Sequence, residues 1–138
     1  LGLSIGCYWS SFDAQLHWFD AHTLRATMQY FVDTQPLLIG FNSIAFDFVV
    51  MRGLLRLEAD ALLQSQEAGE NQRDADELIA LCDIFKVLCM ASYDILAEMW
   101  AISPNRKFEL GLNSLDALCK ANALLAKEIE DSGYEKYL

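Results

Sequence analysis

Pro36-Leu-Leu-Ile-Gly-Phe-Asn-Ser-Ile-Ala-Phe-Asp-Phe-Val-Val-Met-Arg-Gly-Leu-Leu-Arg56 is the stretch that decides the fold class of this chain. It begins with the apolar run 37–39, whose length and composition are typical of a buried strand. Gly40 permits a sharp turn, and Asn42 or Ser43 is placed to cap the helix that follows. A strand that leads through a tight turn into a capped helix is half of a βαβ unit. We therefore predict an α/β fold.

The helix after this turn is predicted to bury one apolar face. That face consists of residues that recur at i, i+4, i+7, i+8 and i+11: Phe46, Val50, Gly53, Leu54 and Leu57. Asp47 falls in the first helical turn, just beyond the carboxyl end of the strand. It favours the positive end of the helix dipole there, and it could equally hold a metal ion in a cleft. The residues alone leave both interpretations open.

The pattern Gly40-Phe41-Asn42, three residues and then Phe46-Asp47 resembles the second signature motif of the DEDD-type 3′–5′ exonucleases. The order of the segments farther along the chain is similar to that of the helicase-associated, YprB-like members. These segments are Cys82-Asp83-Ile84-Phe85, Ile95-Leu96-Ala97-Glu98 and Phe108-Glu-Leu-Gly-Leu-Asn-Ser-Leu-Asp-Ala-Leu118. The resemblance implies a ribonuclease H-like three-layer fold with a mixed β-sheet. It also implies that Asp47 is a catalytic carboxylate and a ligand of Mg²⁺ or Mn²⁺, and that Asn42 contacts the substrate. Without the resemblance, Asn42 is a helix cap that needs no ligand.

Two other motifs of that family have no counterpart here. Its first motif, Asp-x-Glu, would lie upstream of Leu1. Its third motif needs an Asp four positions after a Tyr or His, and here the residue four positions after Tyr134 is Leu138. A two-metal phosphodiesterase needs several converging carboxylates, and only Asp47 matches. We therefore expect residues 1–138 to form a single ribonuclease H-like domain, incomplete at both ends, whose first strand is missing. We expect no nuclease activity from this chain alone.

The missing strand would lie between residues 1–9 and residues 37–41. Without it, two apolar strands would present unpaired edges in the middle of the molecule, and such edges are strongly disfavoured. We therefore predict that these two segments either pair directly or are completed by another chain. Strand exchange of that kind would give a homodimer.

Composition restricts the class of protein further. Hydrophobic residues make up 54% of the chain, which excludes general disorder, and no apolar run approaches the ~20 residues of a membrane span. The net charge of −10 disfavours nucleic acid as a partner, since Lys and Arg contacts to phosphate supply most of that affinity. None of the four cysteines lies in a C-x-x-C pair, so we interpret them as buried thiols of a cytoplasmic protein.

The rest of the chain is assigned mainly from its hydrophobic periodicity. The predicted elements are a strand at 1–9, a turn at 10–14, a strand at 15–19, a helix with the apolar face Leu24, Met28, Phe31 and Val32 that begins after Asp20 and ends at 33–36, a solvated helix end and loop within 64–76, a helix from Leu88 to Ile102 broken by 103–105, a connector at 108–112, a helix capped by Asn113, and a charged tail at 128–138. The residues of the run 78–84 fit either a short strand or a helix start, and the family resemblance implies a strand at 81–84.

Two functional hypotheses follow. The first is a metal-dependent 3′–5′ exonuclease-like domain that acts on nucleic acid. The second is a non-catalytic ribonuclease H-like remnant that serves as a protein-interaction or assembly module. His17 and His22 are interpreted as surface or hydrogen-bonded histidines. Trp9, Trp18 and Trp100 are interpreted as packing residues, because no basic residues alternate with them.

Overall fold

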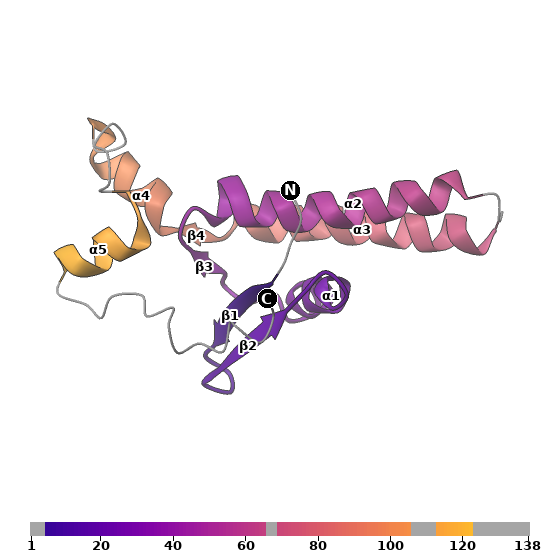
Figure 1. The fold of residues 1–138 in the computed structure, drawn as a ribbon, viewed down its shortest axis with the longest axis horizontal. Helices are drawn as coiled ribbons and strands as arrows, with labels where there is room; N and C mark the ends of the chain where they lie inside the picture. Colours follow the sequence, from indigo (N-terminus) through magenta and orange to yellow (C-terminus); the bar gives the residue numbers. More distant parts are fainter. Residues whose placement is uncertain (1–4, 66–68, 106–112, 123–138) are drawn as a thin grey trace.

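The computed structural model describes residues 5–65, 69–105 and 113–122, which form a mixed α/β architecture (Figure 1). The elements are β1 (Gly6–Ser10), β2 (Gln15–Phe19), α1 (Leu24–Thr34), β3 (Ile39–Gly40), the π-helical turn η1 (Ser43–Asp47), α2 (Phe48–Gln64), α3 (Glu70–Met90), β4 (Tyr93–Asp94), α4 (Ile95–Ile102) and α5 (Leu115–Ala121). The α/β class predicted from the sequence is confirmed. No helix among the described residues combines the length and the hydropathy needed to cross a bilayer.

Strands β1 and β2 form the predicted antiparallel hairpin, in which Tyr8 pairs with His17 and Trp9 with Leu16. Side chains alternate across a strand, so the hairpin has two distinct faces. Tyr8 on the inner face packs edge-on against the Phe31 ring of α1, with ring centroids 4.8 Å apart. Trp9 and Leu16 on the outer face are 63% and 50% exposed, so the prediction that Trp9 is a packing residue is wrong. The predicted residues 1–4 of this strand lie outside the described residues.

Helix α1 buries the face predicted for it, with Leu24, Met28 and Phe31 nearly inaccessible to solvent. Asp20 organises the turn before the helix, because its carboxylate accepts hydrogen bonds from the backbone N–H of His22 and of Thr23, both at 2.9 Å. The helix ends as predicted within residues 33–36. Its orphan Phe31 carbonyl accepts a hydrogen bond from the N–H of Gln35, which adopts the left-handed conformation.

The described strands form two separate two-stranded sheets. Strands β1 and β2 pair antiparallel, and β3 pairs with β4 in parallel, with Ile39 opposite Tyr93. Direct pairing between 1–9 and 37–41, one of the two arrangements expected from the sequence, is therefore wrong for the described residues. The single mixed sheet expected from the resemblance is likewise not formed by them. Strand β4 was missed because it interrupts a segment, 88–102, whose apolar spacing predicts one continuous helix.

Helix α3 corrects a second prediction. Residues 70–90 form one helix, so the strand predicted at 81–84 is wrong, and so is the loop predicted within 64–76 from Glu70 onward. The buried residues of α3 recur at helical spacing: Ala75, Leu78, Leu81, Cys82, Phe85 and Cys89. Acidic residues between them lie on the solvent side, and so this helix looks like a solvated loop when composition alone is considered.

Helix α2 runs antiparallel along α3 and buries a different face from the predicted one (Figure 1). Met51, Leu55 and Ala59 are buried, whereas Phe46 and Leu57 are 51% and 66% exposed. The prediction failed because apolar residues surround most of this helix, so that periodicity alone does not identify the inner face.

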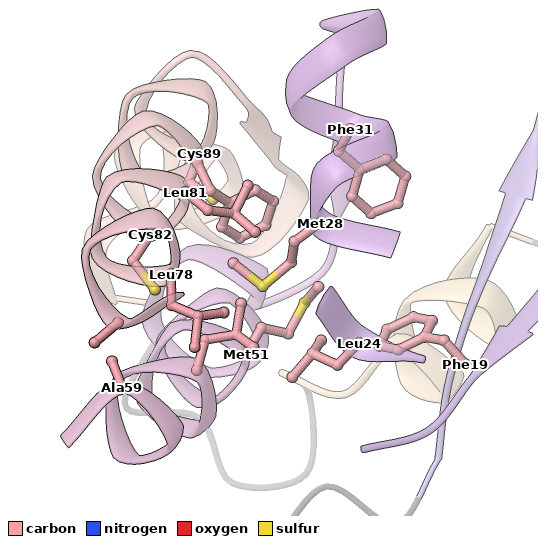
Figure 2. Close-up of a cluster of buried hydrophobic side chains, with 13 residues drawn as sticks. Phe19, Leu24, Met28, Phe31, Met51, Ala59, Leu78, Leu81, Cys82 and Cys89 are labelled. Carbon is pink, nitrogen blue, oxygen red and sulfur yellow. The ribbon is translucent and has the colours of Figure 1, made fainter. Parts of the chain in front are cut away.

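The hydrophobic core lies where α1 crosses the α2–α3 pair (Figure 2). Met28 of α1, Met51 of α2 and Phe85 of α3 contribute buried side chains to it. Helix α5 is capped by Ser114 rather than by the predicted Asn113, since the Ser114 hydroxyl accepts a hydrogen bond from the Ala117 N–H at 3.1 Å. The predicted connector 108–112 and the tail 128–138 lie outside the described residues.

Candidate functional site

Asp47, the predicted catalytic and metal-binding residue, lies at the end of the π-helical turn η1, on the exposed side of the chain. A divalent-cation site needs several oxygen ligands directed at one point. The described residues contain no group of three or more His, Cys, Asp or Glu side chains that could hold a metal ion. The donors in the described part of the chain therefore do not fit an Mg²⁺ or Mn²⁺ site.

Asn42, the predicted substrate contact, occupies the turn between β3 and η1. Its backbone is left-handed, with φ of 60°, a conformation that Asn tolerates better than most residues. Its side chain makes no capping hydrogen bond to the following turn, so the predicted capping role is wrong. The structure instead explains Asn42 by its backbone conformation.

Asp94 performs the capping from the other strand. Its carboxylate is 96% buried and accepts hydrogen bonds from the N–H of Asn42 at 2.9 Å and of Ile44 at 3.0 Å. The same carboxylate caps α4 by accepting from the N–H of Leu96 at 3.1 Å and of Ala97 at 3.4 Å. One side chain therefore joins the β3–η1 turn to the β4–α4 turn.

Burial raises the pKa of Asp94, but the four backbone N–H donors around its carboxylate outweigh that effect and lower the pKa below its usual range. Asp94 is therefore a charged group in a fully hydrogen-bonded setting. Its geometry assigns it a structural role. The sequence signal that would have found it is an Asp placed directly before an apolar helical run, which is a helix-cap position.

A cavity lined by described residues lies between the two small sheets and has a volume of about 490 Å³. We call it the strand groove. One wall is β1 with the turn after it, the opposite wall is the segment 36–39, and Tyr30 and Phe31 of α1 also line it. Figure 1 shows β1 and β3 on neighbouring paths on one side of the long helices. Neither β2 nor β4 lines the groove, so it lies at the edges of β1 and β3 that face away from their partners.

Among the described residues, both of these edges carry backbone groups that have no backbone partner. On β3 the Leu38 carbonyl accepts a hydrogen bond from the Tyr93 N–H at 2.8 Å, so the peptide groups of Ile39 point to the opposite edge. On β1 every second residue directs its N–H and C=O away from β2. Within the described residues, no backbone hydrogen bond joins β1 to the segment 36–39. The groove therefore presents strand-type donors and acceptors on both walls.

The described residues that line the groove have uncharged side chains: Cys7, Tyr8, Trp9, Ser10, Ser11, Phe12, Tyr30, Phe31, Pro36, Leu37, Leu38 and Ile39. Four large apolar residues among them are widely exposed, namely Trp9 at 63%, Phe12 at 78%, Leu37 at 68% and Ile39 at 63%. Sequence analysis identified the two wall segments, through the strand predicted to be missing between 1–9 and 37–41. It did not identify the contribution of α1.

The histidines do not contribute to the groove. His17 Nε2 lies 2.7 Å from Asp13 Oδ2, and its ring stacks on Tyr8 with centroids 4.9 Å apart. His22 lies in the exposed turn before α1. Both are the surface or hydrogen-bonded histidines that the sequence predicted.

Comparison of this chain with protein-family models, with curated proteins and with solved structures found no match.

Proposed function

We propose that this chain is a protein-interaction module that takes up an extended segment of another polypeptide in the strand groove. The observation that carries the proposal is the pair of open strand edges, on β1 and on β3, that face the same uncharged cavity. Addition of a strand to an exposed edge is a recurrent mode of peptide recognition, in which main-chain hydrogen bonds supply affinity. Here the added strand would bond to an edge on each side.

The lining and the charge of the chain support a polypeptide rather than a nucleic acid as the occupant. None of the described residues that line the groove is basic, and the chain carries a net charge of −10. Nucleic-acid binding needs Lys and Arg at the phosphates. A neutral extended segment meets neither charge repulsion nor an unpaired charge in this cavity.

The experiment is a titration of the purified chain with a fluorescent synthetic peptide of about six Val and Ile residues, the usual length of a strand. The test variant is Ile39→Pro, which removes one N–H from the groove wall and leaves the Leu38–Tyr93 hydrogen bond to β4. Its control is Ile39→Ala, which keeps that N–H. We expect saturable binding to the wild type and to Ile39→Ala, and at least tenfold weaker binding to Ile39→Pro, as measured by fluorescence anisotropy.

A second variant pair covers the case in which Ile39→Pro does not fold, as judged by circular dichroism. Trp9→Lys places a charge at the groove, whereas Leu16→Lys places the same charge on the outer face of β2, away from the groove. Only the first should abolish binding. Absence of peptide binding to the wild type, or equal binding to both members of each pair, would overturn the proposal.

The homodimer predicted from the sequence is one form of this function, in which the second copy would fill the groove, so the peptide titrations test the groove in a monomeric wild type. Sedimentation of the unliganded wild type and of the variants distinguishes a second copy from a different polypeptide as the source of the strand. If the wild type is a dimer, and Ile39→Pro or Trp9→Lys converts it to a monomer, the second copy supplies the strand. A monomer that binds the peptide would assign the groove to a different polypeptide.

A second candidate function is metal-dependent 3′–5′ exonuclease activity on nucleic acid. What favours it is the order of elements: an antiparallel hairpin, a helix, and then a strand that is followed by Asp47 and paired in parallel with a later strand, with a gap of strand type beside it. This is the order that the exonuclease resemblance implies. Further metal ligands would have to come from outside the described residues.

Isothermal titration of Mn²⁺ into the wild type and into Asp47→Asn tests this candidate. Saturable binding that is lost in Asp47→Asn and retained in Asp83→Asn would support it. Asp83 is the control because it is an exposed helical carboxylate, paired with Arg56 at 2.8 Å. Equal titration curves for all three proteins would remove the candidate.

A further inference from the structure

The side chains of the groove also indicate what kind of segment fits it, provided that the proposed function holds. Tyr8 and Leu38, one on each wall, pack against the core cluster, and Phe31 of α1 lies within that cluster. The groove is therefore apolar on its core side. Successive side chains of a strand point to opposite faces, so Trp9, Leu37 and Ile39 lie on the outer side. The outer side is apolar as well.

We propose that the ligand of the strand groove is a neutral extended segment with apolar side chains on both of its faces, and not an amphipathic strand. Alternate side chains of such a segment would enter the core side, above Phe31. The others would lie on the outer side, between Trp9 and the pair Leu37 and Ile39. Strands buried on both faces have this composition in general, and they read as continuous runs of Val, Ile and Leu.

The exposed fractions of Trp9, Leu37 and Ile39 support this choice over an amphipathic ligand. A large apolar side chain on the outward face of an antiparallel hairpin, such as Trp9 on β1, is unusual, since that face is normally polar. Here Trp9, Leu37 and Ile39 each expose more than 60% of their surface on the outer side of the groove. An amphipathic strand would leave them in contact with polar groups, whereas a doubly apolar strand removes them from water.

The absence of charged side chains among the described lining residues excludes a third class of ligand, namely strands that bury ionised side chains. No described residue that lines the groove carries a charge, so a Lys or Glu on the ligand would find no partner among them. Burying an unpaired ionised group is strongly unfavourable. We therefore expect selection against charged residues at every position of the ligand that enters the groove.

The test compares three neutral peptides of about six residues with polyethylene glycol caps at both ends, all of strand length. In the first, all side chains are Val or Ile; in the other two, Ser replaces every second residue, in one or the other register. We expect the first to bind about tenfold or more tightly than either alternating peptide, because each apolar side chain withdrawn from the groove loses its burial free energy. Fluorescence anisotropy at two salt concentrations gives the dissociation constants.

Variants of the chain locate the outer-side contact. Trp9→Ala should weaken binding of the doubly apolar peptide and reduce its advantage over the peptide that carries Ser on the outer side. Leu16→Ala should change neither quantity, because Leu16 shares the outer face with Trp9 but does not line the groove. This pair separates loss of a groove contact from loss of exposed apolar surface in general.

The outcomes separate the two proposals. Equal binding of all three peptides, or stronger binding of an alternating peptide, would overturn the ligand class and leave the interaction module standing. Failure of every peptide to bind the wild type would overturn the interaction module itself.

Discussion

The Asp94 carboxylate accepts a hydrogen bond from the backbone N–H of Asn42 at 2.9 Å, across 52 positions of sequence. The bond holds the left-handed turn after β3 against the start of α4. Asn42 precedes the π-helical turn and α2, so this bond, together with the Ile44 N–H bond to the same carboxylate, joins the start of the long helical pair to the small parallel sheet.

Asp94→Asn should lower the free energy of unfolding by about 2–3 kcal/mol. The carboxylate accepts hydrogen bonds from four N–H groups, and the Asn side chain replaces one of its oxygens by an NH₂ group that cannot accept them. Urea unfolding followed by circular dichroism measures it. Asp83→Asn is the control, and it should cost less than about 1 kcal/mol, since the Asp83–Arg56 ion pair is exposed to solvent. Similar losses for the two variants would contradict the role given to Asp94.

The effect of Asp94→Asn should depend on pH. The pKa of Asp94 is lowered in the folded protein, so its charged form contributes stability that is fully present above the unfolded pKa of about 3.9. That contribution is lost as the pH falls through the lower, folded pKa. The difference in unfolding free energy between wild type and Asp94→Asn should therefore be constant above about pH 5 and shrink at lower pH. A difference that grows on acidification would show that the sign is wrong.

Two glycines should respond in opposite directions to the same substitution. A methyl group at Gly40 would overlap Cβ and Oγ of Ser43, so Gly40→Ala should destabilise the protein by about 1–3 kcal/mol. No heavy atom lies near the position of a methyl group at Gly53, in the middle of α2, so Gly53→Ala should stabilise by about 0.5–1 kcal/mol.

Thermal unfolding of both glycine variants provides the measurement. The double variant Gly40→Ala/Ser43→Gly supplies a further check, because it removes the overlapping Ser43 atoms. Its loss of unfolding free energy should be smaller than the sum of the losses in the two single variants. Strict additivity would argue against a steric cause.

The cysteines should differ widely in their reactivity with an alkylating reagent at about pH 8. Burial raises the pKa of Cys89 to about 12 and also raises the pKa of Cys82, whereas Cys7 is exposed at the strand groove. Peptide mapping by mass spectrometry should find Cys7 modified first. In denaturant the three should react at similar rates, and fast labelling of Cys89 in the native protein would contradict its burial.

Sequence analysis predicted the α/β class, the β1–β2 hairpin and the inner face of α1, because each depends on local periodicity. Leu24, Met28 and Phe31 recur at helical spacing and are buried in the structure. The prediction that all four cysteines are buried holds for Cys82 and Cys89, whereas Cys119 is only half-buried and Cys7 is exposed. Neighbours along the chain do not reveal which face of a strand is covered, and Cys7 lies on the uncovered face.

The sequence by itself determined where the chain can turn and which segments are apolar: Gly40 and Asn42 mark a turn, and the run 37–39 marks a strand. Only the tertiary structure decided that residues 70–90 are one helix, because α3 is stabilised by packing its Leu78 and Phe85 side chains against α1 and α2. Only the tertiary structure revealed that Asp94 caps two turns. One of its N–H donors, Leu96, is a near neighbour in the sequence, whereas another, Asn42, lies 52 positions away. The same holds for the strand groove: β1 and β3 are each apolar by sequence, but the cavity between them, which Tyr30 and Phe31 of α1 also line, exists only in the folded chain.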